Sequence, residues 1–341
     1  MANKKGKNIE RKKLSLEIIL MKYGVFIAIA LLFIFFGINV PVFLSIENII
    51  NILRSISLTT LIAVAITVSL PAGGMNLSAP GSTGISMALV AGLLIWNEVP
   101  MIIAILVACI AATIIGLFTA LLAVYFKIDD LLASLALLFV AQGLELTYER
   151  GQSIYPHMLL STSQGFVNAP GTIPDAFIRW GQGNIGPIPI LVIVMFVVVI
   201  VMHFFFNNTK YGRFMYATGG NIEAARLSGI PIKKYKTFAY GLSGFIAGIA
   251  GLLLASRLGS GQCMAANAYF LDSIAASFIG FTVLAQGKAN VFGTFIGAAF
   301  MGVMVNGLIM MNISYNAQSI FKGLVLISAL LLSKITARMQ E

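Results

Sequence analysis

The sequence predicts an all-α polytopic membrane protein, and three observations support this prediction. Apolar residues make up 59% of the 341-residue chain and charged residues only 10%, whereas a soluble domain carries about 25% charged residues. The apolar residues form runs long enough to cross a bilayer. Basic residues gather at the ends of these runs rather than along one face, so a nucleic-acid partner is not expected despite the net charge of +10.

About ten apolar runs, some of them broken, predict about ten transmembrane helices, with both the N-terminus and the C-terminus in the cytoplasm. On this arrangement 17 of the 22 Lys and Arg residues lie inside and four lie outside, which follows the positive-inside rule. The predicted spans are 23–38, 52–70, 82–95, 101–124, 131–148, 188–206, 238–258, 271–284, 291–311 and 317–332.

The chain therefore divides into a basic cytoplasmic tail (1–22), a transmembrane domain (23–334) and a short cytoplasmic tail (335–341). Residues 149–187 are long, polar and poor in basic residues, which predicts an external loop. Residues 207–236 carry six basic residues against one acid, which predicts a cytoplasmic loop.

The first interruption lies between the second and third spans, at 71–82, and contains two prolines and three glycines. Such a segment cannot continue a helix in lipid, so protein or water must satisfy its backbone. Ser82 or Thr83 is expected to cap the next helix. Asn76 and Ser78 either line a polar pathway or only satisfy the broken backbone, and both alternatives stay open.

A second interruption follows the short span 271–284, which is too short for an ideal crossing and is expected to be broken or tilted. Asp272, near its start, is the best intramembrane candidate for a functional charge, although it could equally be a helix N-terminal charge that faces water. Lys322, in the last span, could pair with an acid or extend to the interface. The related places of the two interruptions hint at a duplicated bundle whose broken helices meet at a pathway.

The cytoplasmic loop contains a predicted short helix. Asn221 can cap it, Glu223 lies in its first turn, and Gly229 with Pro231 ends it. Between membrane spans such a helix could bind a cytoplasmic partner or could be a solvated connector, and charge alone favours the connector.

Several functions are excluded or disfavoured by what the sequence lacks. It has no phosphate-binding Gly-Lys-Ser/Thr motif, so the chain alone is not expected to bind ATP in this way. His157 and His203 have no acid and nucleophile beside them, and Cys109 and Cys263 have no metal-ligand or disulfide spacing. We expect no enzyme, no cofactor and no metal. The alternative to an ATP-driven system is an ion-coupled secondary carrier or facilitator that uses Asp272 and Lys322.

Four segments resemble the permease subunits of the ribose/simple-sugar class of bacterial ABC importers, and the resemblance extends over most of the chain. The most specific is the central segment 211–230, YGRFMYATGGNIEAARLSGI, which is followed by the glycine-rich segment 240–251. The segment GGMNLS at 73–78 is similar to the family's Gly-Gly-Ile-Asp-Leu-Ser, and FLDSIAASFIG at 270–280 is similar to its Leu-Asp-Ile-Ala segment.

The resemblance implies a membrane subunit of about ten spans in the bacterial cytoplasmic (inner) membrane. It implies cytoplasmic ATP-binding cassette ATPase subunits, an extracytoplasmic solute-binding protein, and a second permease copy or related permease chain as partners. The solute would be a sugar or sugar-like molecule, moved by alternating access. The residues that would form the ATPase-coupling helix are Gly219, Gly220, Asn221, Glu223, Ala224, Ala225 and Gly229.

The departures from the family pattern concern the pathway and not the coupling loop. Asn76 stands where the family usually has Asp, Gly280-Phe281 replaces Gly-Gly, and 286–289 replaces a glycine-richer turn. Asn76, Ser78 and Asp272 are the candidate pathway residues. Because the departures fall at pathway-lining positions, the resemblance does not choose among sugars.

Overall fold

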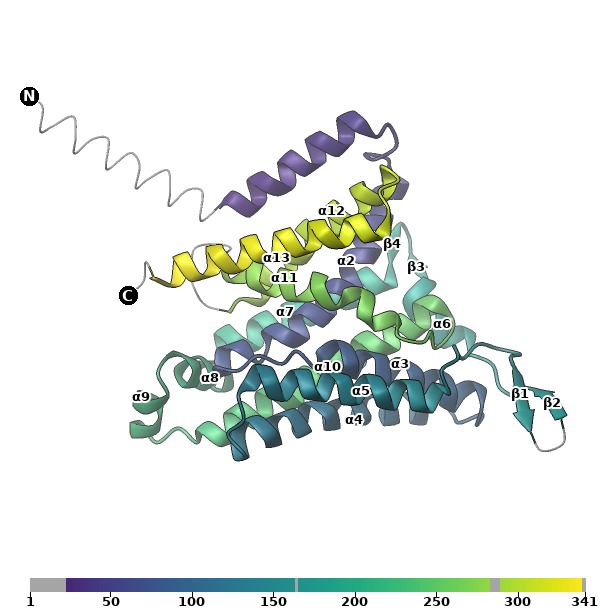
Figure 1. The fold of residues 1–341 in the computed structure, drawn as a ribbon, viewed down its shortest axis with the longest axis horizontal. Helices are drawn as coiled ribbons and strands as arrows, with labels where there is room; N and C mark the ends of the chain where they lie inside the picture. The colour runs from purple at the N-terminus through teal and green to yellow at the C-terminus, as the bar shows by residue number, and fades with distance from the viewer. Residues whose placement is uncertain (1–22, 163–164, 283–288, 339–341) are drawn as a thin grey trace, which may run out of the picture.

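The computed structural model describes residues 23–162, 165–282 and 289–338, and within them the protein is mostly helical (Figure 1). The predicted basic tail at 1–22 lies outside the described residues, as do residues 283–288 of the second interruption and 339–341 of the C-terminal tail.

The described residues begin with a helix at Tyr23–Asn39, which has no label in Figure 1. The labelled helices are α2 (Ile46–Thr67), α3 (Ala79–Ile95), α4 (Met101–Ala120), α5 (Asp130–Glu149), α6 (Asp175–Gln182), α7 (Ile190–Asn208), α8 (Lys210–Gly220), α9 (Ile222–Leu227), α10 (Ile232–Leu258), α11 (Phe270–Thr282), α12 (Val291–Met310) and α13 (Tyr315–Arg338). Short 3-10 turns lie at Leu70–Ala72 and Ala265–Tyr269, and α4 continues as a π-helical turn at Leu121–Tyr125.

Six helical segments in the described residues are long and apolar enough to cross a membrane, and three shorter helices are apolar. The six are Ile46–Ala72, Met101–Tyr125, Asp130–Glu149, Ile190–Asn208, Ile232–Leu258 and Val291–Met310; the shorter ones are Tyr23–Asn39, Ala79–Ile95 and Tyr315–Leu331. The prediction of a multi-pass helical membrane protein is thus confirmed.

The core of the bundle is built around α10. Within its most apolar stretch 78% of the residues are buried, against 33% for α4, α5 and α7. It packs against α2, α3 and α4, while α12 packs against α2 and α11. The outer faces of α4, α5 and α7 carry exposed Leu, Ile, Val and Phe side chains, as expected for helices that face lipid.

Glycines allow the central helices to approach closely. A Cβ atom on Gly244 of α10 would lie 2.5 Å from the carbonyl oxygen of Ala112 in α4. A Cβ on Gly297 of α12 would lie 2.3 Å from the carbonyl oxygen of Ala276 in α11. These distances leave no room for a side chain, so glycine sets the helix separation at both crossings.

The first interruption is shorter than predicted. The 3-10 turn at Leu70–Ala72 ends at Gly73, whose φ of +73° is easily adopted only by glycine, and α3 then begins at Ala79. Pro80 is accepted because it lies in the first turn of α3, where a missing N–H breaks no helical hydrogen bond. The expectation that Ser82 or Thr83 caps α3 was wrong, since both lie inside the helix.

The predicted external loop at 149–187 holds more structure than expected. An antiparallel pair, β1 (Leu159–Thr162) and β2 (Gly165–Asn168), is followed by α6 and by the pair β3 (Asn184–Ile185) and β4 (Ile188–Pro189). In Figure 1 the hairpin β1–β2 projects from one end of the bundle, and α9 lies at the opposite end.

Two helices in the second half differ from their predicted bounds. Helix α8 was not predicted, and α10 begins at Ile232, so three basic residues expected in the loop lie in its first turns. The short span expected to be broken is one helix, α11, within the described residues.

Candidate coupling and translocation sites

The two helices α8 and α9 form the candidate coupling site. Thr209 ends α7 in an extended conformation, and its hydroxyl accepts the N–H of Gly212 at 3.2 Å, which starts α8. Asn221 is also extended, with φ −153° and ψ 103°, and separates α8 from α9. Its side-chain oxygen accepts the N–H of Ala224 at 2.9 Å, so the predicted N-cap is confirmed.

The end of α9 also matches the sequence signals. Gly229 has a φ of +75°, and the N–H of Ile230 returns to the carbonyl oxygen of Ala225 at 3.0 Å. This is a C-terminal turn that favours glycine because a Cβ would strain the left-handed backbone.

One face of α9 is anchored and the rest is free. Ala225 is buried, whereas Ile222 is 50% exposed and Leu227 86% exposed. Glu223 forms an ion pair with Arg226 at 2.5 Å on the exposed surface. An exposed leucine on a short, capped helix at the end of a bundle is a surface suited to a partner protein.

The predicted coupling residues thus lie at the end of α8, on α9 and in the caps of α9. Gly219 differs from the others in its surroundings. A Cβ atom on Gly219 would lie 2.4 Å from the carbonyl oxygen of Pro71, in the first interruption. A Cβ on the adjacent Gly220 would meet nothing within 4 Å.

The predicted pathway residues Asn76 and Ser78 lie together in the interior. Asn76 donates through its side-chain nitrogen to the hydroxyl of Ser243 in α10 at 2.9 Å, and its backbone N–H donates to the hydroxyl of Ser69 at 2.9 Å. The hydroxyl of Ser78 donates to the Asn76 side-chain oxygen at 2.6 Å and lies 3.2 Å from that of Thr119 in α4. Both side chains are fully buried and hydrogen-bonded within the protein in this conformation.

Asp272 lies apart from this cluster and pairs with Lys322. The Nζ atom of Lys322 lies 2.8 Å from Oδ2 of Asp272, and both residues are 7% exposed. The pair joins α11 to α13, so of the two possibilities for Lys322 the structure has the one in which it pairs with an acid.

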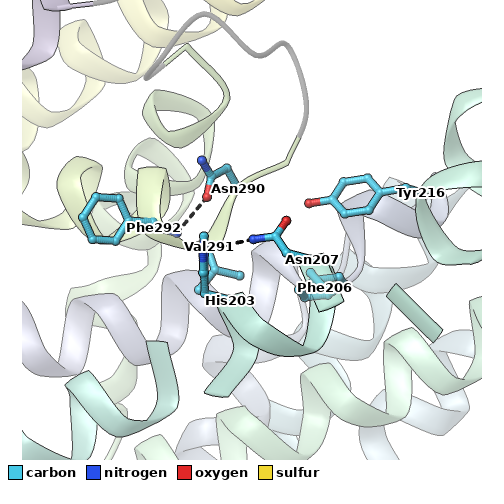
Figure 2. Close-up of a pocket in the computed structure, with 7 residues that line it drawn as sticks. All are labelled: His203, Phe206, Asn207, Tyr216, Asn290, Val291 and Phe292. Carbon is cyan, nitrogen blue, oxygen red and sulfur yellow. Dashed lines mark hydrogen bonds between the residues drawn. The ribbon is translucent and has the colours of Figure 1, made fainter. Parts of the chain in front are cut away.

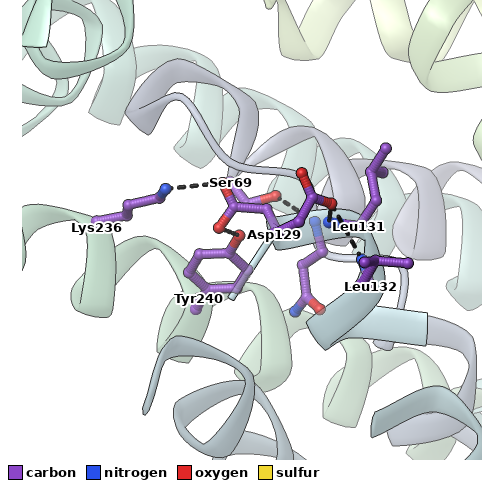
Figure 3. A network of polar contacts seen from close by, with 8 residues as sticks. Ser69, Asp129, Leu131, Leu132, Lys236 and Tyr240 are labelled. Atoms are coloured by element: carbon purple, nitrogen blue, oxygen red, sulfur yellow. Dashed lines mark hydrogen bonds and ion pairs between the residues drawn. The ribbon is translucent and has the colours of Figure 1, made fainter. Parts of the chain in front are cut away.

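A third polar group, not singled out from the sequence, supports the first interruption (Figure 3). Asp130, in the first turn of α5, accepts the hydroxyl of Tyr240 at 2.7 Å and the ammonium of Lys236 at 2.7 Å, both from α10. A Cβ on Gly74 would lie 2.5 Å from the Tyr240 hydroxyl, so Tyr240 closes one side of the interruption. No sequence signal links Asp130 with Tyr240, because 110 residues separate them.

A pocket lies where α7, α8 and the start of α12 meet (Figure 2). Its lining residues are His203, Phe206, Asn207, Tyr216, Asn290, Val291 and Phe292. The hydroxyl of Tyr216 donates to the carbonyl oxygen of Ala289 at 2.5 Å. Burial raises the pKa of Tyr216 to about 12.

Near the C-terminal end of α5, Glu145 and Glu149 are buried, and Glu145 accepts the N–H of Met264 at 3.0 Å. The described residues hold no group of three His, Cys, Asp or Glu side chains arranged to bind a metal ion.

The sequence comparisons point to one class of protein. The family described as "Branched-chain amino acid transport system / permease component" matches residues 48–330. The chain is 34% identical over 325 residues to the ribose import permease protein RbsC of Bacillus subtilis (strain 168), covering 95% of this chain and 96% of that protein. It is 33% identical over 306 residues to the ribose import permease protein RbsC of Haemophilus influenzae, covering 90% and 91%.

A third relative, the xylose transport system permease protein XylH of Escherichia coli (strain K12), is 28% identical over 376 aligned positions, which cover 96% of this chain and 94% of that protein. No solved structure gives a significant match.

Proposed function

We propose a solute class and an ATPase-binding element for this protein. The premise is that the chain belongs to the branched-chain amino acid transport system / permease component family. The chain is a multi-pass inner-membrane permease subunit of a bacterial ABC importer and not an enzyme. A permease of this kind implies separate ATPase and solute-binding partners, in keeping with the lack of a phosphate-binding motif in the sequence.

The proposed solute is a sugar or sugar-like molecule. Three of the relatives that cover most of this chain are permeases whose names specify ribose or xylose. The carrier alternative would use Asp272 and Lys322 as coupling groups, and their mutual pairing at 2.8 Å gives it no support. We therefore propose ATP-driven import by alternating access, with ribose and xylose as the first solutes to test.

The proposed ATPase-binding element is α9, and its exposed, capped structure is the observation that carries this assignment. Asn221 and Gly229 fix its two ends, and Leu227 extends into solvent. A rigid helix of this kind can convert closure of the ATPase subunits into movement of the spans. The coupling residues are those predicted: Gly219, Gly220, Asn221, Glu223, Ala224, Ala225 and Gly229.

The binding side for the solute-binding protein follows from the orientation of the bundle in the membrane. With α9 in the cytoplasm, the hairpin β1–β2 at the opposite end faces outside (Figure 1), where a solute-binding protein would bind. The proposed topology has ten spans with both termini in the cytoplasm. A second permease copy or related permease chain completes the pathway. Asn76, Ser78 and Asp272 remain the proposed pathway residues.

Two matched substitutions test the ATPase site. Leu227→Asp introduces a charge on α9, and Val167→Asp does the same at a 53% exposed residue of β2. Purified permease with Leu227→Asp is expected to lose its ATPase during affinity purification, whereas Val167→Asp keeps the ATPase and loses stimulation by the binding protein. Retention of the ATPase by Leu227→Asp would overturn the assignment of α9. Wild-type permease reconstituted without ATPase should show no concentrative uptake.

A further inference from the structure

We propose that α8 is a lever that connects the ATPase-binding helix to the first interruption through Gly219 and to the start of α12 through Tyr216. This inference rests on the proposed function, because it assumes that α9 binds the ATPase. It assigns to Tyr216 and Gly219 the positioning roles through which a movement of α9 reaches the spans.

The first contact is made between backbones. A Cβ on Gly219 would lie 2.4 Å from the Pro71 carbonyl oxygen and 2.7 Å from the Gly73 nitrogen. In the other direction, a Cβ on Gly73 would lie 3.1 Å from the Gly219 Cα. No flexible side chain separates the two segments, so a shift of the end of α8 displaces Gly73 directly.

From Gly73 the displacement reaches buried polar groups within a few residues. The Tyr240 hydroxyl occupies the space that a side chain on Gly74 would need, and Asn76 is hydrogen-bonded to Ser69 and Ser243. Hydrogen-bonded groups without access to water have few alternative partners, so their arrangement changes only when the segment moves. The first interruption is therefore held between α8 on one side and α10 on the other.

The second contact is a hydrogen bond. The Tyr216 hydroxyl donates to the Ala289 carbonyl oxygen at 2.5 Å. Ala289 is one residue before Asn290, whose side chain caps α12 (Figure 2). The Tyr216 ring packs edge-on against Phe206, with ring centroids 5.9 Å apart. Since burial raises the pKa of Tyr216 to about 12, the hydroxyl keeps its proton and remains a donor at physiological pH.

The end of α2, which precedes the first interruption, also contacts the start of α12. The hydroxyls of Thr67, at the end of α2, and Thr294, in the first turn of α12, lie 2.8 Å apart. Helix α8 is eleven residues long and is capped by Thr209. It therefore moves as a unit, and its two contacts act on neighbouring parts of the bundle.

The test uses the full complex of permease, ATPase and solute-binding protein in lipid nanodiscs. Hydrogen exchange is measured for residues 70–78 and 289–294, with and without a non-hydrolysable ATP analogue. In the wild type both segments should change their exchange rates on nucleotide binding. The proposal is overturned if the exchange rates of both segments stay the same on nucleotide binding. Because this measurement needs no substitution and no identified solute, it decides the proposal even if a variant fails to fold.

Variants then separate the two contacts. Tyr216→Phe removes only the hydroxyl and is expected to abolish the change at 289–294 while keeping that at 70–78. Its matched control is Tyr211→Phe in the same helix, which should behave as the wild type. Gly219→Ala should abolish the change at 70–78, with the open helical glycine Gly143 replaced by Ala as its control.

Transport gives the second readout. Labelled ribose or xylose, whichever the wild-type complex imports, is measured in proteoliposomes together with ATP hydrolysis. Tyr216→Phe is expected to keep its ATPase subunits but to import about fivefold less solute per ATP, as expected for one lost hydrogen bond. Wild-type coupling in both Tyr216→Phe and Gly219→Ala would overturn the lever. Loss of the ATPase in Tyr216→Phe would also overturn it, because it would make this part of α8 a docking surface. Failure of the α9 assignment is detected separately, by retention of the ATPase in Leu227→Asp.

Discussion

Asp272 and Lys322 form a buried ion pair that the sequence alone did not predict. Both residues are 7% exposed, and Oδ1 of Asp272 makes no hydrogen bond in the described residues. Two charges removed from water stabilise a protein little as a pair, but removal of one partner leaves an uncompensated charge. The pair is thus sensitive to single substitutions and tolerant of a double one.

Lys322→Met is therefore expected to lower the free energy of unfolding by about 3–5 kcal/mol. The double variant Asp272→Asn/Lys322→Met should recover most of the loss, because no unpaired charge remains. Thermal unfolding in detergent measures both, and Lys234→Met, at an exposed lysine of α10, is the control. A Lys322→Met protein as stable as the wild type would contradict this account.

The same double variant addresses the role of Asp272 in transport. If Asp272 serves the pathway, the variant should be stable yet inactive in ATP-driven uptake. If the pair only joins α11 to α13, uptake should follow stability. From the sequence, Asp272 was either a functional charge or a helix N-terminal charge that faces water. Its burial and its pairing with Lys322 exclude the water-facing alternative.

At the scale of elements, α9 illustrates what local sequence signals predict well. Its cap, Asn221, and its end, Gly229, act within four residues of the helix, so the pattern alone was sufficient. Helix α12 was likewise predicted at 291–311 and ends at Met310, because a long apolar run defines it.

Helix α8 was not predicted from the sequence, and its glycines explain why. Its sequence holds three glycines, which disfavour a helix. Tertiary contacts explain two of them: a Cβ on Gly212 would lie 2.2 Å from the Phe206 carbonyl oxygen, and one on Gly219 would collide with the first interruption. The glycines are needed for packing against segments distant in sequence or across a sharp turn, and local propensity does not register this.

The cap of α9 gives a prediction at this scale. Asn221→Ala removes the acceptor of the Ala224 N–H and should destabilise α9 by about 1 kcal/mol. The permease should then bind its ATPase about fivefold more weakly, since the binding-competent helix is less populated. Binding in nanodiscs measures this effect. Asn221→Asp, which keeps an acceptor, should bind as the wild type does. Equal binding by Asn221→Ala and wild type would show that the cap is irrelevant to docking.

For the whole molecule, composition and charge placement predicted the class of protein because both are properties of the bilayer as a solvent. The contacts that hold the candidate sites together could not be predicted from the sequence, because each joins residues more than 70 positions apart. They are Asp130 with Tyr240, Asn76 with Ser243 and Tyr216 with Ala289. Only the fold brings them together, and α10 supplies several of the partners because it is the most buried of the long helices.

The orientation of the whole bundle yields the last prediction. In a background of Cys109→Ala/Cys263→Ser, single cysteines replace Leu227 of α9 and Val167 of β2, which are 86% and 53% exposed. A membrane-impermeant maleimide applied to intact cells should label Val167→Cys and not Leu227→Cys, and permeabilised cells should show labelling of both. The expectation follows from the charge distribution, because the loop that holds α9 is rich in basic residues and the hairpin region is not. Labelling of Leu227→Cys in intact cells would reverse the orientation and, with it, the assignment of α9 to the ATPase, since ATP is supplied from the cytoplasm.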